Sequence, residues 1–161
     1  MVSKLRYSAS MGTRKSSGSV IFAAFALLLC CTRAAYSETA PCALLTQNQV
    51  STAVGTSVGA GSPIANTGCS WTATGARRVM VTVSMQSEKM FAAVKSSVPP
   101  KTTKTQVSGV GDEAIFTGVQ NFSSLWVRKG TKFLLVRAYG LPVSEAETAL
   151  KVLAASAVSK L

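Results

Sequence analysis

The sequence predicts a single α+β domain in which helices pack on a mainly antiparallel sheet, and three observations lead to this fold class. Several segments alternate apolar and polar residues with a period of two, which is typical of strands with one buried face. Two of these segments are joined by a turn short enough for a hairpin, so their strands are antiparallel. The helical patterns stand between and after groups of strands, which favours α+β over a parallel βαβ arrangement. The expected order of elements is α-β-β-α-β-β-β-α.

The N-terminal segment is typical of a secretory signal peptide. Residues 1–15 contain four basic residues and no acid, and an apolar run follows at 20–31. That run is too short to cross a bilayer, which takes about 20 residues, but it suits the apolar part of a signal peptide. Small residues, Ala35 and Ser37, precede the expected cleavage site. We therefore expect residues 1–37 to be removed during export, with an uncleaved membrane anchor as the alternative.

Residues 38–161 are expected to form one exported, monomeric domain without a membrane span. The whole chain has a net charge of +11, but only twelve of its 17 basic residues lie in this part, together with all six acids, which gives +6. A surface of this charge is compatible with anionic lipids, cell-wall polymers or nucleic acid, but it is more often only a solubility feature, and we expect no specific binding of nucleic acid. The chain has no histidine, which excludes Ser-His-Asp and Cys-His catalytic arrangements. We expect no catalytic residue, no cofactor and no metal.

Two cysteines, Cys42 and Cys69, remain after the signal peptide, and they are expected to form a disulfide. An even pair of cysteines in a chain bound for an oxidising compartment favours this bond. Closing a loop of this length should stabilise the domain by about 3.5 kcal/mol. The alternative is a metal site with two thiolates, which lacks further ligands because there is no histidine.

The first half of the domain begins with a predicted helix. Thr46 and Gln49 form the pattern of a capping box, and Gly55 is a typical stop signal. Residues 56–68 are rich in Gly, Ser and Pro and are expected to be a loop. Two strands follow, at 69–74 and 77–85.

The second half contains a short helix, three strands and a long helix. Ser87 is the expected cap of the short helix, which must end before the two prolines that open an exposed connector at 99–106. A strand begins within 107–116, and a polar link leads to a hairpin expected to turn at Lys129 and Gly130. In the last helix, Ser144 and Glu147 have the spacing of a second capping box. Its apolar residues share one face.

The stretch VSGVGDEAIF, residues 107–116, looks most like a catalytic or binding site, and its residues allow three interpretations. A phosphate loop is disfavoured because acids and a strand follow the glycines, where a helix is required. A catalytic pair is disfavoured because Asp112 and Glu113 are neighbours, and neighbours on a strand point to opposite faces. The favoured interpretation is a turn, in which glycines permit the bend and acids accept hydrogen bonds from the backbone.

The hairpin predicts a candidate partner surface. With Lys129 and Gly130 as the turn, Trp126 lies opposite Phe133, and an aliphatic face packs under the last helix. The other face mixes aromatic rings with arginine, a composition found at binding hot spots. Its candidate residues are Trp126, Arg128, Phe133, Arg137 and Tyr139. The alternative is that the first helix or the 56–68 loop covers this face as a second core layer.

Taken together, the segments PCALLTQNQV, GCSW, VSGVGDEAIF and LWVRKGTKFLLV and the closing amphipathic helix resemble a known kind of domain. They are similar to small exported or lipoprotein-like bacterial domains of unknown function. The resemblance implies a paired Cys42 and Cys69, a periplasmic or extracellular location associated with the envelope, and an α+β fold similar to that of the PsbP group. It supplies no catalytic residue. Many such domains carry a lipid-anchored cysteine, whereas here Leu29 stands before Cys30 in place of a small residue.

The expected function is that of a non-enzymatic envelope domain that binds an envelope protein or a small ligand. The absence of histidine and the scarcity of acids favour this class. The alternative is a hydrolase-type enzyme with an atypical carboxylate site at Asp112 and Glu113.

Overall fold

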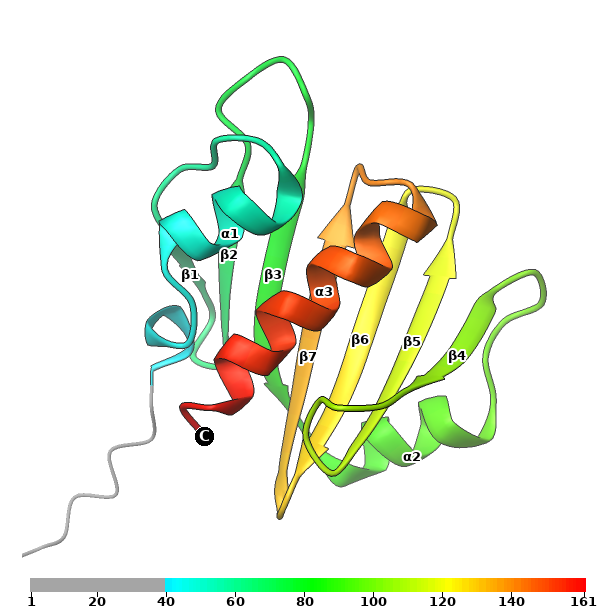
Figure 1. Ribbon diagram of the computed structural model, residues 1–161. Helices are drawn as coiled ribbons and strands as arrows, with labels where there is room; N and C mark the ends of the chain where they lie inside the picture. Colours follow the sequence, from blue (N-terminus) through cyan, green and yellow to red (C-terminus); the bar gives the residue numbers. More distant parts are fainter. Residues whose placement is uncertain (1–39) are drawn as a thin grey trace, which may run out of the picture. The chain divides into compact units, whose positions relative to one another are not determined.

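The computed structural model describes residues 40–161, which form one α+β domain (Figure 1). The predicted signal peptide, residues 1–37, lies outside the described residues. In chain order the elements are η1 (Pro41–Ala43), α1 (Gln47–Val54), β1 (Ser62–Ile64), β2 (Gly68–Thr72), β3 (Met80–Gln86), α2 (Glu88–Ser96), β4 (Thr103–Val107), β5 (Glu113–Val119), β6 (Phe122–Lys129), β7 (Lys132–Tyr139) and α3 (Val143–Val158).

The sheet has seven strands in the order β1-β2-β3-β7-β6-β5-β4, and all neighbours are antiparallel. The predicted fold class is therefore confirmed, but the predicted order lacked β1 and β4. These two strands form the edges of the sheet and lie in the segments predicted as a loop and as a connector. Their side chains are exposed apart from Val107, so the sequence shows no alternation of apolar and polar residues there. Backbone hydrogen bonds to one neighbour hold them, and Pro63 is tolerated because β1 is an edge strand.

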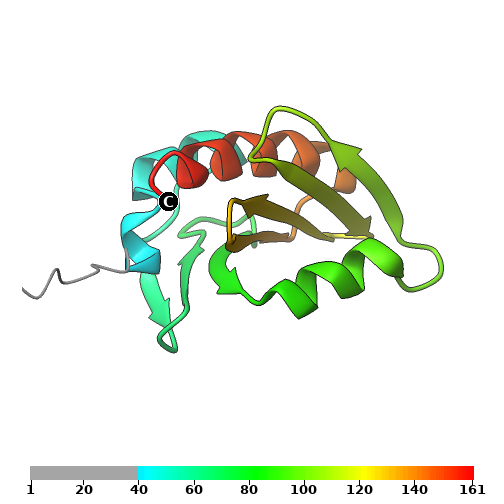
Figure 2. The same cartoon turned by 90° about the horizontal axis from the view of Figure 1, so that it is seen from below.

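Helices cover both faces of the sheet, to different extents. Figure 2 shows α1 and α3 on one side of the sheet and α2 on the other. Helix α3 packs on β5, β6 and β7, and α1 packs against α3. The main core lies between these two helices and the sheet. Helix α2 contacts β6 and β7 on the opposite face and encloses a second, smaller apolar cluster that consists of Phe91, Ile115, Trp126, Phe133 and Leu135.

The beginnings of the helices were predicted with mixed success. The capping box of Thr46 and Gln49 is formed at α1, and Ser87 caps α2. The predicted capping box at α3 is wrong. That helix begins at Val143 after Pro142, whose carbonyl accepts a hydrogen bond from the N–H of Ala146 at 2.9 Å, and no side chain caps it.

The β6–β7 hairpin turns one residue later than predicted. Lys129 pairs with Lys132, so Gly130 and Thr131 are the turn residues and Trp126 lies opposite Leu135. Gly130 adopts a φ of 57° at the first turn position, where type II′ turns favour glycine. The change shifts the pairing by two residues, and the side chains therefore keep their predicted faces. The predicted aliphatic face belongs to the main core, and it consists of Leu125, Val127, Leu134, Val136 and Ala138.

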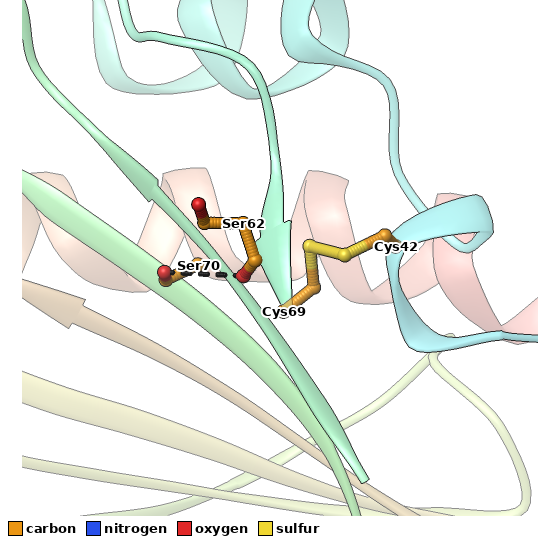
Figure 3. Close-up of a disulfide and its surroundings, with 4 residues drawn as sticks. All are labelled: Cys42, Ser62, Cys69 and Ser70. Carbon is orange, nitrogen blue, oxygen red and sulfur yellow. Dashed lines mark hydrogen bonds between the residues drawn. A yellow bond between two sulfur atoms is a disulfide. The ribbon is translucent and has the colours of Figure 1, made fainter. Parts of the chain in front are cut away.

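The predicted disulfide between Cys42 and Cys69 is confirmed. Figure 3 shows how it joins the 3₁₀ turn η1 to strand β2, and Cys69 is fully buried. Beside it, the hydroxyl of Ser70 donates a hydrogen bond of 3.3 Å to the carbonyl of Ser62 in β1. The disulfide therefore fixes the start of the domain to β2, near the β1 edge of the sheet.

Candidate functional site

The Asp112–Glu113 stretch forms a turn that is bound to the β6–β7 hairpin. Gly109 and Gly111 adopt φ values of 81° and 63° and bend the chain before β5. The carboxylate of Asp112 accepts a hydrogen bond of 2.6 Å from the backbone N–H of Gly130. The N–H of Asp112 donates to the carbonyl of Arg128 at 2.8 Å. The acid thus connects two turns at the same end of the sheet, as the turn interpretation predicts.

Both acids are engaged by cations. Asp112 lies 3.7 Å from Arg128 and 3.6 Å from Lys129, and Glu113 lies 2.7 Å from Lys95 and 3.6 Å from Arg128. The Gly130 hydrogen bond, followed by Lys129 and Arg128, lowers the pKa of Asp112. The hydrogen bond from Lys95 is the main cause that lowers the pKa of Glu113. A general acid needs a carboxyl group that is protonated near neutral pH, and neither residue supplies one.

The double variant Asp112→Asn/Glu113→Gln is expected to be less stable than the wild type at neutral pH, with a lower urea midpoint. Because the folded pKa of each acid is below its usual value of 3.8 or 4.5, the ionic stabilisation is fully present above about pH 4.5. It is lost as the pH falls through the lowered folded pKa values. Urea unfolding should therefore show a difference that narrows between about pH 6 and about pH 3.

Glu147→Gln is the matched control, since Glu147 forms none of the ion pairs found among residues 40–161. A difference between the double variant and the wild type that is the same at both pH values would contradict the ionic role of Asp112 and Glu113.

The predicted partner surface lies on one face of the sheet, but the structure divides it into three parts. Trp126 and Phe133 are only 5% and 9% exposed, since α2 covers them and the ring of Phe91 lies 5.5 Å from that of Phe133. Arg128 lies at the hairpin end, engaged with the two acids. Arg137 and Tyr139 are half-buried, and Arg137 lines a pocket together with Val94 near the end of α2. The predicted cover by the first helix or the 56–68 loop is wrong, because those segments lie elsewhere and α2 covers this face.

A pocket of about 190 Å³ opens where α2 ends, and we call it the Arg137 pocket. On one side it is lined by Val94 of α2 and by the segment that follows this helix, including Val98. On the other side it is lined by strands β5, β6 and β7, on the face of the sheet opposite to α3, and this side includes Phe122, Trp126 and Arg137. Helix α2 is too short to cover the whole of this face, and the pocket is the gap that remains.

Arg137 is held by aromatic rings and has no carboxylate partner in the described part of the chain. Its guanidinium carbon lies 5.9 Å from the ring centres of both Phe122 and Trp126, within the range of cation–π attraction. Its Nε atom is buried and has no hydrogen-bond partner. None of the ion pairs among residues 40–161 includes Arg137. Among these residues, Arg137 therefore places an unpaired positive charge on the wall of the pocket.

A larger hollow of about 490 Å³ lies between α1 and α3, and it contrasts with the Arg137 pocket. Arg77 and Glu145 both line it, and they pair with each other. Glu145 therefore already balances the charge of Arg77, and an anionic ligand would bind there less favourably.

Sequence reasoning found part of this site and missed the rest. Trp126 and Arg137 were candidates because aromatic residues alternate with arginine on one face of the hairpin, whereas the candidate Tyr139 does not line the pocket. Phe122 was missed because the predicted polar link hid the true start of β6. The segment after α2 was missed because its prolines and polar residues predict a solvent-exposed connector, and only tertiary packing brings it beside the sheet.

Comparisons with protein-family models, with curated proteins and with solved structures give no match for this chain. The resemblance to exported bacterial domains and to the PsbP group therefore stays a prediction.

Within residues 40–161, no helix is both long and apolar enough to cross a membrane. The same residues contain no group of three or more His, Cys, Asp or Glu side chains placed to hold a metal ion.

Proposed function

We propose that residues 38–161 are an exported, non-enzymatic binding domain of the cell envelope and that the Arg137 pocket is the ligand-binding site. The observation that carries the proposal is that Arg137 lines a largely apolar pocket and forms no ion pair with a carboxylate among residues 40–161. A cation on an apolar pocket wall without a protein counter-ion favours the binding of an anionic ligand.

Other features support the remaining parts of the proposal. The Cys42–Cys69 disulfide is of the kind that persists in oxidising compartments, in agreement with the predicted signal peptide. The two neighbouring acids are tied to cations and to the hairpin backbone, so no observation favours the hydrolase alternative. Binding with no chemical step requires only the pocket and its arginine.

A photocrosslinking experiment tests this function. A benzophenone amino acid at Val98, which lines the pocket, should form adducts with a ligand when the exported protein is prepared from cells. The same group at Val152, which is 56% exposed on α3, should not. Intact mass spectrometry of both proteins measures the adducts. No adduct at Val98, or equal labelling at the two positions, would reject the proposal.

A further inference from the structure

The size of the Arg137 pocket limits what it can enclose. A dry cavity of about 150 Å³ holds one benzene ring, and whole drug-sized ligands occupy about 300 Å³ or more. With about 190 Å³, this pocket takes one aromatic ring or a short acyl chain. Val94, Val98, Phe122 and Trp126 supply apolar walls for such a group. The enclosed part of the ligand is therefore small and apolar.

The charge in the pocket limits the ligand further. Among residues 40–161, Arg137 is the only charged side chain that lines the pocket. Arginine stays protonated at any physiological pH. The single positive charge of Arg137 is balanced by a single negative charge, whereas a second negative charge would remain uncompensated in a largely apolar site. A monoanion therefore fits the pocket better than a dianion.

The donor geometry favours a carboxylate among the monoanions. A guanidinium group presents parallel N–H donors in a planar fork, and a carboxylate accepts two of them at once. The Nε donor that lacks an acceptor lies on one edge of this fork. Nε itself is enclosed by protein atoms, so a bidentate carboxylate would accept from the two terminal nitrogens of the fork. A phosphate monoester carries about −1.5 to −2 charges at neutral pH and does not match the single cation.

We infer that the Arg137 pocket selects small organic monocarboxylates whose apolar part is one ring or a short acyl chain. This inference rests on the proposed binding function and names the chemical class of its ligand. Arg137 binds the carboxylate, and Phe122 and Trp126 hold both the guanidinium and the apolar part of the ligand.

The two tryptophans provide an internal comparison for testing this inference by NMR. Trp126 lines the pocket, whereas Trp71 is 1% exposed in the main core. Phenylacetate added to the exported ¹⁵N-labelled protein should shift the indole N–H signal of Trp126 and leave that of Trp71 in place. Phenylacetamide has the same shape without the charge and should bind at least about tenfold more weakly. Phenyl phosphate should also bind more weakly than phenylacetate.

Variants of the two arginines supply the matched comparison. Arg137→Gln keeps a polar side chain but removes the cation, and it should weaken phenylacetate binding by at least about tenfold. Arg77→Gln, in the hollow between α1 and α3, should leave the affinity unchanged. If Arg137→Gln does not fold, the comparison of phenylacetate with phenylacetamide on the wild type still decides the question.

Three results would overturn the inference: equal affinity for acid and amide, tighter binding of phenyl phosphate, or no saturable shift of Trp126 with phenylacetate. Adducts at Val98 together with any of these results would keep the proposed function and reject only the ligand class. Selective binding of phenylacetate without adducts at Val98 would support the ligand class and reject the proposed function, since the exported protein would then carry no ligand in the pocket.

Discussion

Gly140→Ala is expected to lower the free energy of unfolding by about 3–5 kcal/mol, the largest effect of any single substitution considered. Gly140 follows β7 with a φ of 83°, a conformation that alanine disfavours. A methyl group at this position would lie only 1.9 Å from the carbonyl oxygen of Arg78. The backbone of either segment must move to relieve that contact, and this disturbs the hydrogen bond from Gly140 to the carbonyl of Asn121.

Two other glycines separate the causes of this effect. Gly109 has a similar φ of 81° but no atom near the added methyl group, so Gly109→Ala should cost only about 1–2 kcal/mol. Gly75 has open space and no positive φ, and Gly75→Ala should leave the stability unchanged or raise it by up to about 1 kcal/mol. Urea unfolding of the three variants makes the comparison. If Gly140→Ala costs no more than Gly109→Ala, close approach of the Arg78 backbone is not the cause.

Removing the Cys42–Cys69 disulfide is expected to cost about 3.5 kcal/mol of unfolding free energy. The bond closes a loop with a sequence separation of 27, and opening it returns that loop's entropy to the unfolded chain. The double variant Cys42→Ala/Cys69→Ala is preferred to serine substitutions because Cys69 is fully buried and a hydroxyl there would need a partner. Its urea midpoint is compared with that of the oxidised wild type.

The wild type under reducing conditions is the control for the disulfide variant. It should lose a similar amount of stability, since it also lacks the cross-link but keeps both sulfur atoms. Peptide mapping without reductant should first recover Cys42 linked to Cys69. An oxidised protein no more stable than the reduced one would contradict the stabilising role of the bond.

The parts of the fold that the sequence predicted are those with a periodic pattern of apolar residues or a short connecting turn. The alternation in β3 and the apolar face of α3 report the burial of one face directly, and the short turn identified β6 and β7, whose centres are buried on both faces. Strands β1 and β4 were missed because backbone pairing at a sheet edge leaves little trace in side-chain polarity. The predicted cap of α3 was wrong because the helix begins at Val143, directly after Pro142. Ser144 therefore lies inside the first turn and cannot act as the cap.

The candidate site was predicted only as far as one strand pair could define it. The alternation along the β6–β7 hairpin placed Trp126, Arg137 and Tyr139 on a common face, and the even shift in register preserved that prediction. It could not show that α2 buries Phe133 or that Arg128 joins the two acids. Those outcomes depend on where α2 and the β5 turn pack, which is a tertiary property.

The pairing of β3 with β7 has a consequence for how the chain folds. Strands β1 to β3 pair through local turns, but β3 meets its other neighbour only in β7, where Val83 lies opposite Val136. The sheet is therefore incomplete until nearly the whole chain is present, and contacts between such distant residues slow folding. The disulfide, in contrast, lies entirely within the first half of the domain. Because the N-terminal half is synthesised first, the disulfide can form before the sheet is complete. It then already links η1 to β2 when β7 is synthesised and joins β3 to β6.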